Sequence, residues 1–165
     1  MKLCKRIPRI QWASIHQSEK FISVEPLSGS RRGLPEDESY VIYLEPCATD
    51  EALGGALLEA LNRSRFVDPT KERGFFKGDR VARADERWHQ DFMTRYGYET
   101  KRQAYKNMRY CRAKRCEGKI SIEPHRRDKP QYWWDLPADR TVVIPATTDP
   151  IAAGAALKLA LSRCE

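Results

Sequence analysis

The sequence predicts one α+β domain over residues 1–165, internally duplicated in the order strands, helix, strands, helix, with antiparallel sheets. Three repeated runs carry this prediction. Residues 21–26 (FISVEP) return 98 positions later as residues 119–124 (KISIEP). Residues 46–50 (PCATD) return as residues 145–149 (PATTD), and Gly54–Arg63 returns as Gly154–Arg163. A unit of about 60 residues buries too little apolar surface alone, so we expect both copies to share one core.

The repeats set the expected boundaries. Repeat one spans about residues 5–66 and repeat two about residues 105–165, each with a small antiparallel sheet and one helix. A connector of about residues 67–104 has no counterpart. Within the connector, Asp85–Tyr96 is expected to be helical because its aromatic residues recur every fourth position and Gly97 follows as a stop.

The first repeat contains three stretches with strand character. Ile10–Ile15 contributes Trp12 as a core candidate, and Phe21–Val24 is a short β-rich run followed by a proline two residues later. Tyr40–Leu44 is β-branched and aromatic on both faces, which is typical of a buried strand. The segment Leu27–Ser39 holds two glycines and a proline, so we expect it to be a loop.

A helix is predicted after each set of strands. Thr49 and Asp149 can cap free backbone N–H groups, and Pro150 stands at the first helical position, where its missing N–H costs nothing. Gly54 and Gly154 lie inside the helices and indicate a close approach of the helix backbone to the sheet. The apolar residues recur at i, i+3 and i+4. This spacing places four leucines in the core: Leu57, Leu61, Leu157 and Leu161.

The bulk composition favours a protein of the reduced cytosol. No apolar run approaches the roughly 20 residues of a membrane span, and Met1–Arg6 lacks the apolar region of a signal peptide. The five cysteines follow no disulfide framework and are interpreted as reduced thiols. The net charge of +7 is uneven: residues 1–66 carry 0, residues 67–104 carry +2 and residues 105–165 carry +5. This asymmetry indicates an acidic or polyanionic partner near the second repeat.

The sequence offers no catalytic constellation. It contains three histidines, and no Gly-rich phosphate loop, nucleophile elbow or paired-histidine motif. Cys111 and Cys116 with His125 downstream have the side chains of a zinc site, but the spacing matches no familiar zinc finger, which favours reduced structural thiols. We therefore predict no enzymatic activity, no cofactor and no metal.

Recognition of a partner is the remaining function, and arginine and aromatic residues are common in binding hot spots. Residues 109–115 have charge on both alternating faces, as an edge strand or exposed ribbon has. Arg126, Arg127 and Lys129 are placed in the loop that follows, and one of the two neighbouring tryptophans is expected to fill the core. The candidate partner-binding residues are Arg109, Arg112, Arg115, Arg126, Arg127, Trp133 and Trp134.

Several runs together resemble the immunity proteins of bacterial contact-dependent growth inhibition systems, the CdiI type. These runs are residues 35–37 (PED), 49–54 (TDEALG), 57–61 (LLEAL), 64–66 (SRF), 95–101 (RYGYETK), 106–108 (KNM) and 160–164 (ALSRC). The resemblance covers nearly the whole chain. It implies a cytoplasmic protein that binds and neutralises the C-terminal toxin domain, often a nuclease, of a CdiA-type effector. It assigns no binding residue to this sequence.

Some immunity proteins of this kind look like Whirly single-stranded-DNA-binding proteins, whose strands–helix–strands–helix layout agrees with the duplication. The alternative function is therefore a single-stranded nucleic-acid-binding protein of Whirly-like fold. This chain lacks a Lys-Gly-Lys-Ala-Ala-Leu-like run, and residues 77–79 (KGD) are the nearest piece. This departure makes nucleic acid the less favoured partner.

Overall fold

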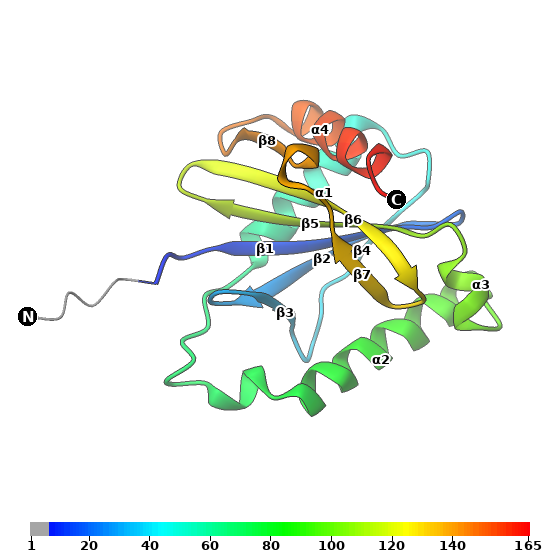
Figure 1. Ribbon diagram of the computed structural model, residues 1–165, viewed down its shortest axis with the longest axis horizontal. Helices are drawn as coiled ribbons and strands as arrows, with labels where there is room; N and C mark the ends of the chain where they lie inside the picture. The colour runs from blue at the N-terminus through cyan, green and yellow to red at the C-terminus, as the bar shows by residue number, and fades with distance from the viewer. Residues whose placement is uncertain (1–6) are drawn as a thin grey trace, which may run out of the picture.

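The computed structural model describes residues 7–165, so Met1–Arg6 and the expected start of repeat one near residue 5 lie outside the described residues. Within residues 7–165 an antiparallel sheet of eight strands carries α1 and α4 on one face, while α2 runs past the other (Figure 1). The strand order is β3-β2-β1-β5-β6-β7, with β4 also paired to β2 and β8 to β6. The α+β class is confirmed. No helix in this part of the chain is long and apolar enough to cross a membrane.

The elements follow one another in the predicted order. The first half contains β1 (Gln11–Gln17), β2 (Ile22–Gly29), β3 (Gly33–Pro35), β4 (Ile42–Leu44) and α1 (Asp50–Arg63). The connector contains a 3-10 turn (Arg73–Phe76), α2 (Gly78–Tyr96) and α3 (Lys101–Tyr105). The second half contains β5 (Arg109–Cys116), β6 (Lys119–Lys129), β7 (Tyr132–Asp135), a 3-10 turn (Ala138–Arg140), β8 (Val142–Pro145) and α4 (Pro150–Ser162).

The two halves pair their strands alike. Near its start β2 pairs with β4, through Ile22 opposite Leu44, and β6 pairs with β8 through Ile120 opposite Ile144. Near their ends, β2 pairs with β3 and β6 pairs with β7. β4, within the expected strand over 40–44, and β8 therefore hold equivalent places in the two halves. The division of the chain into repeats within a single domain stays a prediction.

The halves meet in the middle of one continuous sheet. β1 pairs with β5 in an antiparallel register that sets Ala13 opposite Ala113. The expectation of two separate small sheets was wrong, because this central pair joins them. The expectation that residues 109–115 form an edge strand or exposed ribbon was also wrong, since β5 lies between β1 and β6. Its charged side chains meet partners inside the protein, which the charge pattern alone does not reveal.

Two strands run further than expected. β2 continues through Pro26 to Gly29 and β3 follows, so the predicted loop over 27–39 was wrong in its first half. β6 likewise continues through Pro124 to Lys129, which places Arg126 and Arg127 in a strand rather than a loop. Each proline lies where the outer edge of its strand has no partner, between β4 and β3 or between β8 and β7. On that side no neighbouring strand is present, so the missing N–H of the proline costs no hydrogen bond between strands.

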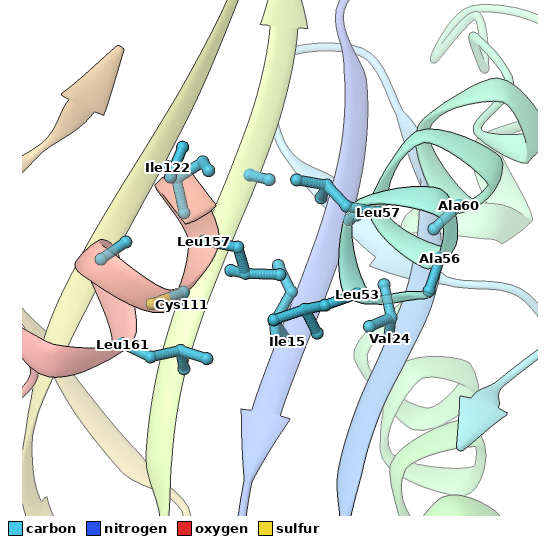
Figure 2. Close-up of a cluster of buried hydrophobic side chains, with 14 of the residues drawn as sticks. Ile15, Val24, Leu53, Ala56, Leu57, Ala60, Cys111, Ile122, Leu157 and Leu161 are labelled. Atoms are coloured by element: carbon cyan, nitrogen blue, oxygen red, sulfur yellow. The ribbon is translucent and has the colours of Figure 1, made fainter. Parts of the chain in front are cut away.

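The main core lies between the sheet and the pair α1 and α4. Alternate residues of β1 and β5 point toward the helices, including Ile15 and Cys111, and meet the leucine stripes of both helices (Figure 2). The predicted caps are present: Thr49 and Asp149 each accept a hydrogen bond from a backbone N–H three residues later. The core prediction for the leucines is confirmed, because each is at most 2% exposed: Leu57, Leu61, Leu157 and Leu161.

We expect Leu61→Ala to lower the free energy of unfolding by about 2–5 kcal/mol, because the side chain is fully buried and its removal leaves a cavity. Leu159→Ala is the matched control, since Leu159 lies on α4 with 45% of its surface exposed and should cost at most about 0.5 kcal/mol. Urea unfolding at equilibrium measures both. A cost for Leu61→Ala no greater than that of the control would contradict the packing.

The helical glycines allow α1 and α4 to touch backbone to backbone. A methyl carbon at Gly54 would overlap the carbonyl oxygen of Pro150 and lie 2.6 Å from the nitrogen of Gly154. A methyl carbon at Gly154 would overlap the carbonyl oxygen of Asp50. The interpretation that these glycines approach the sheet was therefore wrong. They form a helix–helix crossing between the two halves.

The connector packs against part of the other face of the sheet. α2 begins at Gly78, a full two turns before the expected start, and ends as predicted at Gly97 in the left-handed conformation with φ of 67°. Trp88 and Phe92 from α2 pack with Phe21 of the sheet and with Tyr105 of α3 in a second core cluster. α2 is held there by aromatic packing and stands beside, rather than flat upon, the centre of the sheet (Figure 1).

Candidate functional site

A cleft of about 460 Å³ lies on the sheet face opposite α1 and α4. Its floor is formed by Ser14 and His16 of β1, Glu25 of β2 and Tyr110 of β5. The walls come from three places: the end of β2 with β3, the turn and strand of the β6–β7 hairpin, and α2 with α3. The wall residues are Leu27, Gly33, Leu34, Pro35, Val81, Asp85, Trp88, His89, Tyr105, Gln131, Tyr132 and Trp133.

Two glutamates stand in the same row across this face. Strand register sets Glu25 opposite Ser14, Ser14 opposite Arg112, and Arg112 opposite Glu123. Glu25 and Glu123 are the matching residues of the two repeats, from the runs SVEP and SIEP. Their surroundings nevertheless differ.

Glu123 forms ion pairs with two basic side chains from the same half of the chain. Arg112 donates to it at 2.7 and 2.9 Å from two guanidinium nitrogens, and the ammonium of Lys114 lies 2.7 Å away. Burial raises the pKa of Glu123, but Lys114 and Arg112 outweigh burial and hold that pKa below its usual value. This carboxylate is therefore ionised and paired at neutral pH.

Glu25 has no such partner. The places that Arg112 and Lys114 take in the second half are held in the first by Ser14 and His16. Glu25 is 7% exposed and accepts a hydrogen bond from the Ser39 hydroxyl. Burial, with a smaller contribution from Asp85, raises its pKa to about 7, although hydrogen bonds from Ser39 and Ser14 act in the opposite direction. Among residues 7–165, neither Lys nor Arg lines the cleft.

The histidines of the cleft carry no charge at neutral pH. The ring of His16 lies 4.5 Å from that of Trp88 and 4.8 Å from that of Tyr110. Burial, and then the nearby His89 and His125, lower its pKa to about 3. His89 lies 2.7 Å from the Tyr105 hydroxyl and 2.7 Å from the Asp85 carbonyl oxygen, and burial lowers its pKa as well. The cleft is thus acidic and aromatic, with Glu25 and Asp85 as its charged groups.

The structure separates the sequence-predicted arginines by strand face. Arg112 faces the cleft side but is engaged with Glu123. Arg115 points to the opposite face, where it bonds the side-chain oxygens of Gln11 and Asn62 at 2.6 Å each. Arg109 is exposed at the start of β5. These three side chains do not form one surface.

The hairpin of β6 and β7 brings the other four predicted residues into two pairs. Arg127 stands opposite Trp133, and Arg126 stands opposite Trp134. Trp133 packs against the second core cluster and lies 5.3 Å from the ring of Tyr110, whereas Trp134 is exposed. One tryptophan is therefore partly buried and the other free, as expected of the pair. The role of these residues in binding stays a prediction.

The side chains that were weighed as a zinc site, and not favoured as one, do not come together. Cys111 faces the helices, while His125 follows Pro124, the register partner of Cys111, and so faces the cleft side. Across residues 7–165 no group of three His, Cys, Asp or Glu side chains is placed to hold a metal ion.

The family model described as CDI immunity protein (CdiI) matches residues 11–164. This chain belongs to the CDI immunity protein family. A curated relative, immunity protein CdiI-YPIII of Yersinia pseudotuberculosis serotype O:3 (strain YPIII), is 30% identical over 96% of this chain and 98% of its own.

Two solved structures share the fold of this CDI immunity protein. A protein of unknown function from Neisseria meningitidis superposes with a TM-score of 0.88 at 30% identity, covering 94% of this chain and 96% of its own. A CdiA-CT/CdiI toxin and immunity complex from Y. pseudotuberculosis contains a chain that superposes with a TM-score of 0.87 at 27% identity. That match covers 94% of this chain and 98% of the other.

Sequence reasoning missed the acidic cleft of this CDI immunity protein. The signal was present in the repeat itself. Glu25 and Glu123 align, yet the basic residues that precede Glu123 have no counterpart before Glu25. What was lacking was the strand register, which shows that residues 14 and 16 occupy the positions of residues 112 and 114.

Proposed function

We propose that this protein binds the C-terminal toxin domain of a cognate CdiA-type effector and neutralises it. The observation that carries this proposal is the likeness, over almost the full length of both chains, to a chain of a solved CdiA-CT/CdiI toxin and immunity complex. Family membership supports it independently. The protein acts by occupying the toxin and performs no reaction of its own.

The cytoplasm is the place where such an inhibitor acts, because it protects the cell that makes it from an incoming toxin. We propose a nuclease as the toxin's activity.

Rapid capture of the toxin benefits from complementary charge between the two proteins, which raises association rates toward roughly 10⁸ M⁻¹s⁻¹ at low salt. Arg126, which is exposed opposite Trp134, and the partly buried Arg127 remain candidates for the rim of the interface.

Co-expression with the toxin domain encoded beside the gene tests the proposal. We expect the protein to restore growth of cells that produce this domain and to co-purify with it as a stable complex. Isothermal titration of the two purified proteins should show saturable binding. An unrelated CdiA C-terminal domain serves as the control and should not bind, because immunity is specific to the cognate toxin.

The result that would contradict this function is equally defined. Cells that still stop growing, together with no binding by titration, would exclude neutralisation of that toxin. Tight binding of single-stranded oligonucleotides with a steep salt dependence would instead favour the nucleic-acid-binding alternative.

A further inference from the structure

We propose that Glu25 is the receptor for a lysine or arginine side chain that the toxin domain inserts into the cleft. The proposal rests on the proposed function and adds the chemistry of the contact. The inserted cation takes the place that Arg112 and Lys114 occupy beside Glu123 in the second half. The protein thus carries a closed copy and an open copy of one ion-pair site.

The closed copy shows what the open copy lacks. In the second half two cations from β5 reach the glutamate of β6: Arg112 lies directly opposite Glu123 in the strand register, and Lys114 lies opposite Ser121, two residues away. In the first half the equivalent positions on β1 hold a serine and a neutral histidine. Both halves carry the glutamate, but the first half lacks its cation. Glu25 therefore stays unpaired unless another molecule supplies a cation.

An unpaired buried carboxyl is an unfavourable feature for folding alone. Burying an ionised group without a partner is costly, and proteins usually pair such groups. Glu25 is nine-tenths buried, and its neighbour Asp85 adds a second acid rather than a cation. The raised pKa reflects this cost. A basic side chain entering the cleft would remove it.

The cleft has the shape and lining for such a side chain. Its volume of about 460 Å³ exceeds the room that one lysine or arginine needs, and aromatic rings line it from several sides. Trp88, Tyr110 and Trp133 are among the lining residues, and aromatic rings attract a cation in a desolvated site. No cation of the described chain competes for this position.

A polypeptide fits the cleft better than a free cation does. The volume of the cleft leaves room around one basic side chain, and the flanking residues of a toxin segment can fill that room. The cleft therefore matches a protein segment with a basic residue near its tip.

The test compares the two repeat-equivalent glutamates by measuring the affinity and rates of binding to the purified toxin domain. Glu25→Gln keeps the shape but removes the charge, so the dissociation constant should rise about 30-fold or more, mainly through faster dissociation. Glu123→Gln, the matched control, should change it less than about 3-fold because its partners are internal. Replacing each Lys and Arg of the toxin by Ala should reveal one residue whose loss has no further effect in the Glu25→Gln background.

A second variant supplies the missing cation from within. Ser14→Arg copies Arg112 into the first half, and the open cleft has room for the new side chain beside Glu25. This variant should lose affinity as Glu25→Gln does, while circular dichroism shows an intact fold.

Each outcome bears on a different claim. If the wild-type protein does not bind the toxin domain, the proposed function fails. If the wild type binds and Glu25→Gln binds equally well, or if no basic toxin residue couples to Glu25, the inserted-cation site is overturned while the proposed function stands.

Discussion

Gly54→Ala should lower the free energy of unfolding by about 3 kcal/mol or more, whereas Gly55→Ala, one residue away, should raise it by up to about 1 kcal/mol. The added methyl group at Gly54 overlaps the backbone of α4, and neither helix can move a carbonyl group aside as a flexible side chain can. At Gly55 nothing lies within 4 Å of the added carbon. There the substitution gains helix propensity without a clash.

Equilibrium unfolding in urea measures both variants under the same conditions. Gly154→Ala tests the same contact between α1 and α4 from the other helix, because its methyl group would overlap the carbonyl of Asp50 on α1. It should also lower the free energy of unfolding. Equal stability of the two neighbouring variants, Gly54→Ala and Gly55→Ala, would show that α1 and α4 do not touch at these glycines.

Glu25→Gln should stabilise the protein at pH 8 by about 3 kcal/mol and leave its stability unchanged near pH 4. The folded-state pKa of Glu25 is raised to about 7, above its unfolded value of 4.5. Below pH 4.5 the carboxyl is protonated in both states and carries no cost. As the pH rises through this window, the unfolded chain ionises first, so the wild type loses stability up to about pH 7.

The other titratable groups near Glu25 do not mask this effect. His16, from β1, stays neutral throughout because its pKa is about 3. Burial raises the pKa of Asp85, on α2, and burial also raises that of Tyr110 on β5, which stays protonated. Asp85 is present in both proteins, so the difference between wild type and variant isolates Glu25.

Glu123→Gln is the matched control, and its effect should have the opposite sign. Its folded-state pKa is lowered, so it contributes stability above its unfolded pKa that is lost as the pH falls through the folded value. Removing its charge should cost about 1–2 kcal/mol at pH 8, since the ion pairs are only partly buried. Thermal or urea unfolding between pH 4 and 8 measures both. A loss of stability in Glu25→Gln at pH 8 would exclude an unpaired carboxyl at this position.

Local signals were enough to predict α1, α4 and the leucines that both helices bury in the core. Caps at Thr49 and Asp149 and the leucine stripes depend on neighbours within one or two turns, and the structure contains all of them. β3 could not be predicted, because three residues around Gly33–Pro35 form a strand only through pairing with the end of β2. The early start of α2 was hidden in the same way, since Arg80 and Ala84 are buried by contacts made elsewhere in the chain.

The candidate site was less accessible to sequence reasoning than the fold. Arg112 and Arg115 were predicted to face a partner, but a position in the centre of the sheet gives each an internal acceptor. Charge along a chain does not show which charges neutralise one another. Glu25 was overlooked for the same reason, because an acid without a partner is recognised only after the neighbours of every strand are known.

The central pairing of β1 with β5 also sets the order in which the chain can fold. Gln11 faces Arg115 across this pair, and α1 meets its packing partner in the last helix of the chain. Contacts between segments so distant in sequence slow folding, because the chain loses the entropy of the long intervening loop before the stabilising contacts form. A nascent chain therefore keeps β1 unpaired on one edge until β5 has been synthesised, and its α1 glycine surface stays bare until translation is nearly complete. Only the nearly finished polypeptide can therefore make both the β1–β5 pairing and the contact of α1 with α4.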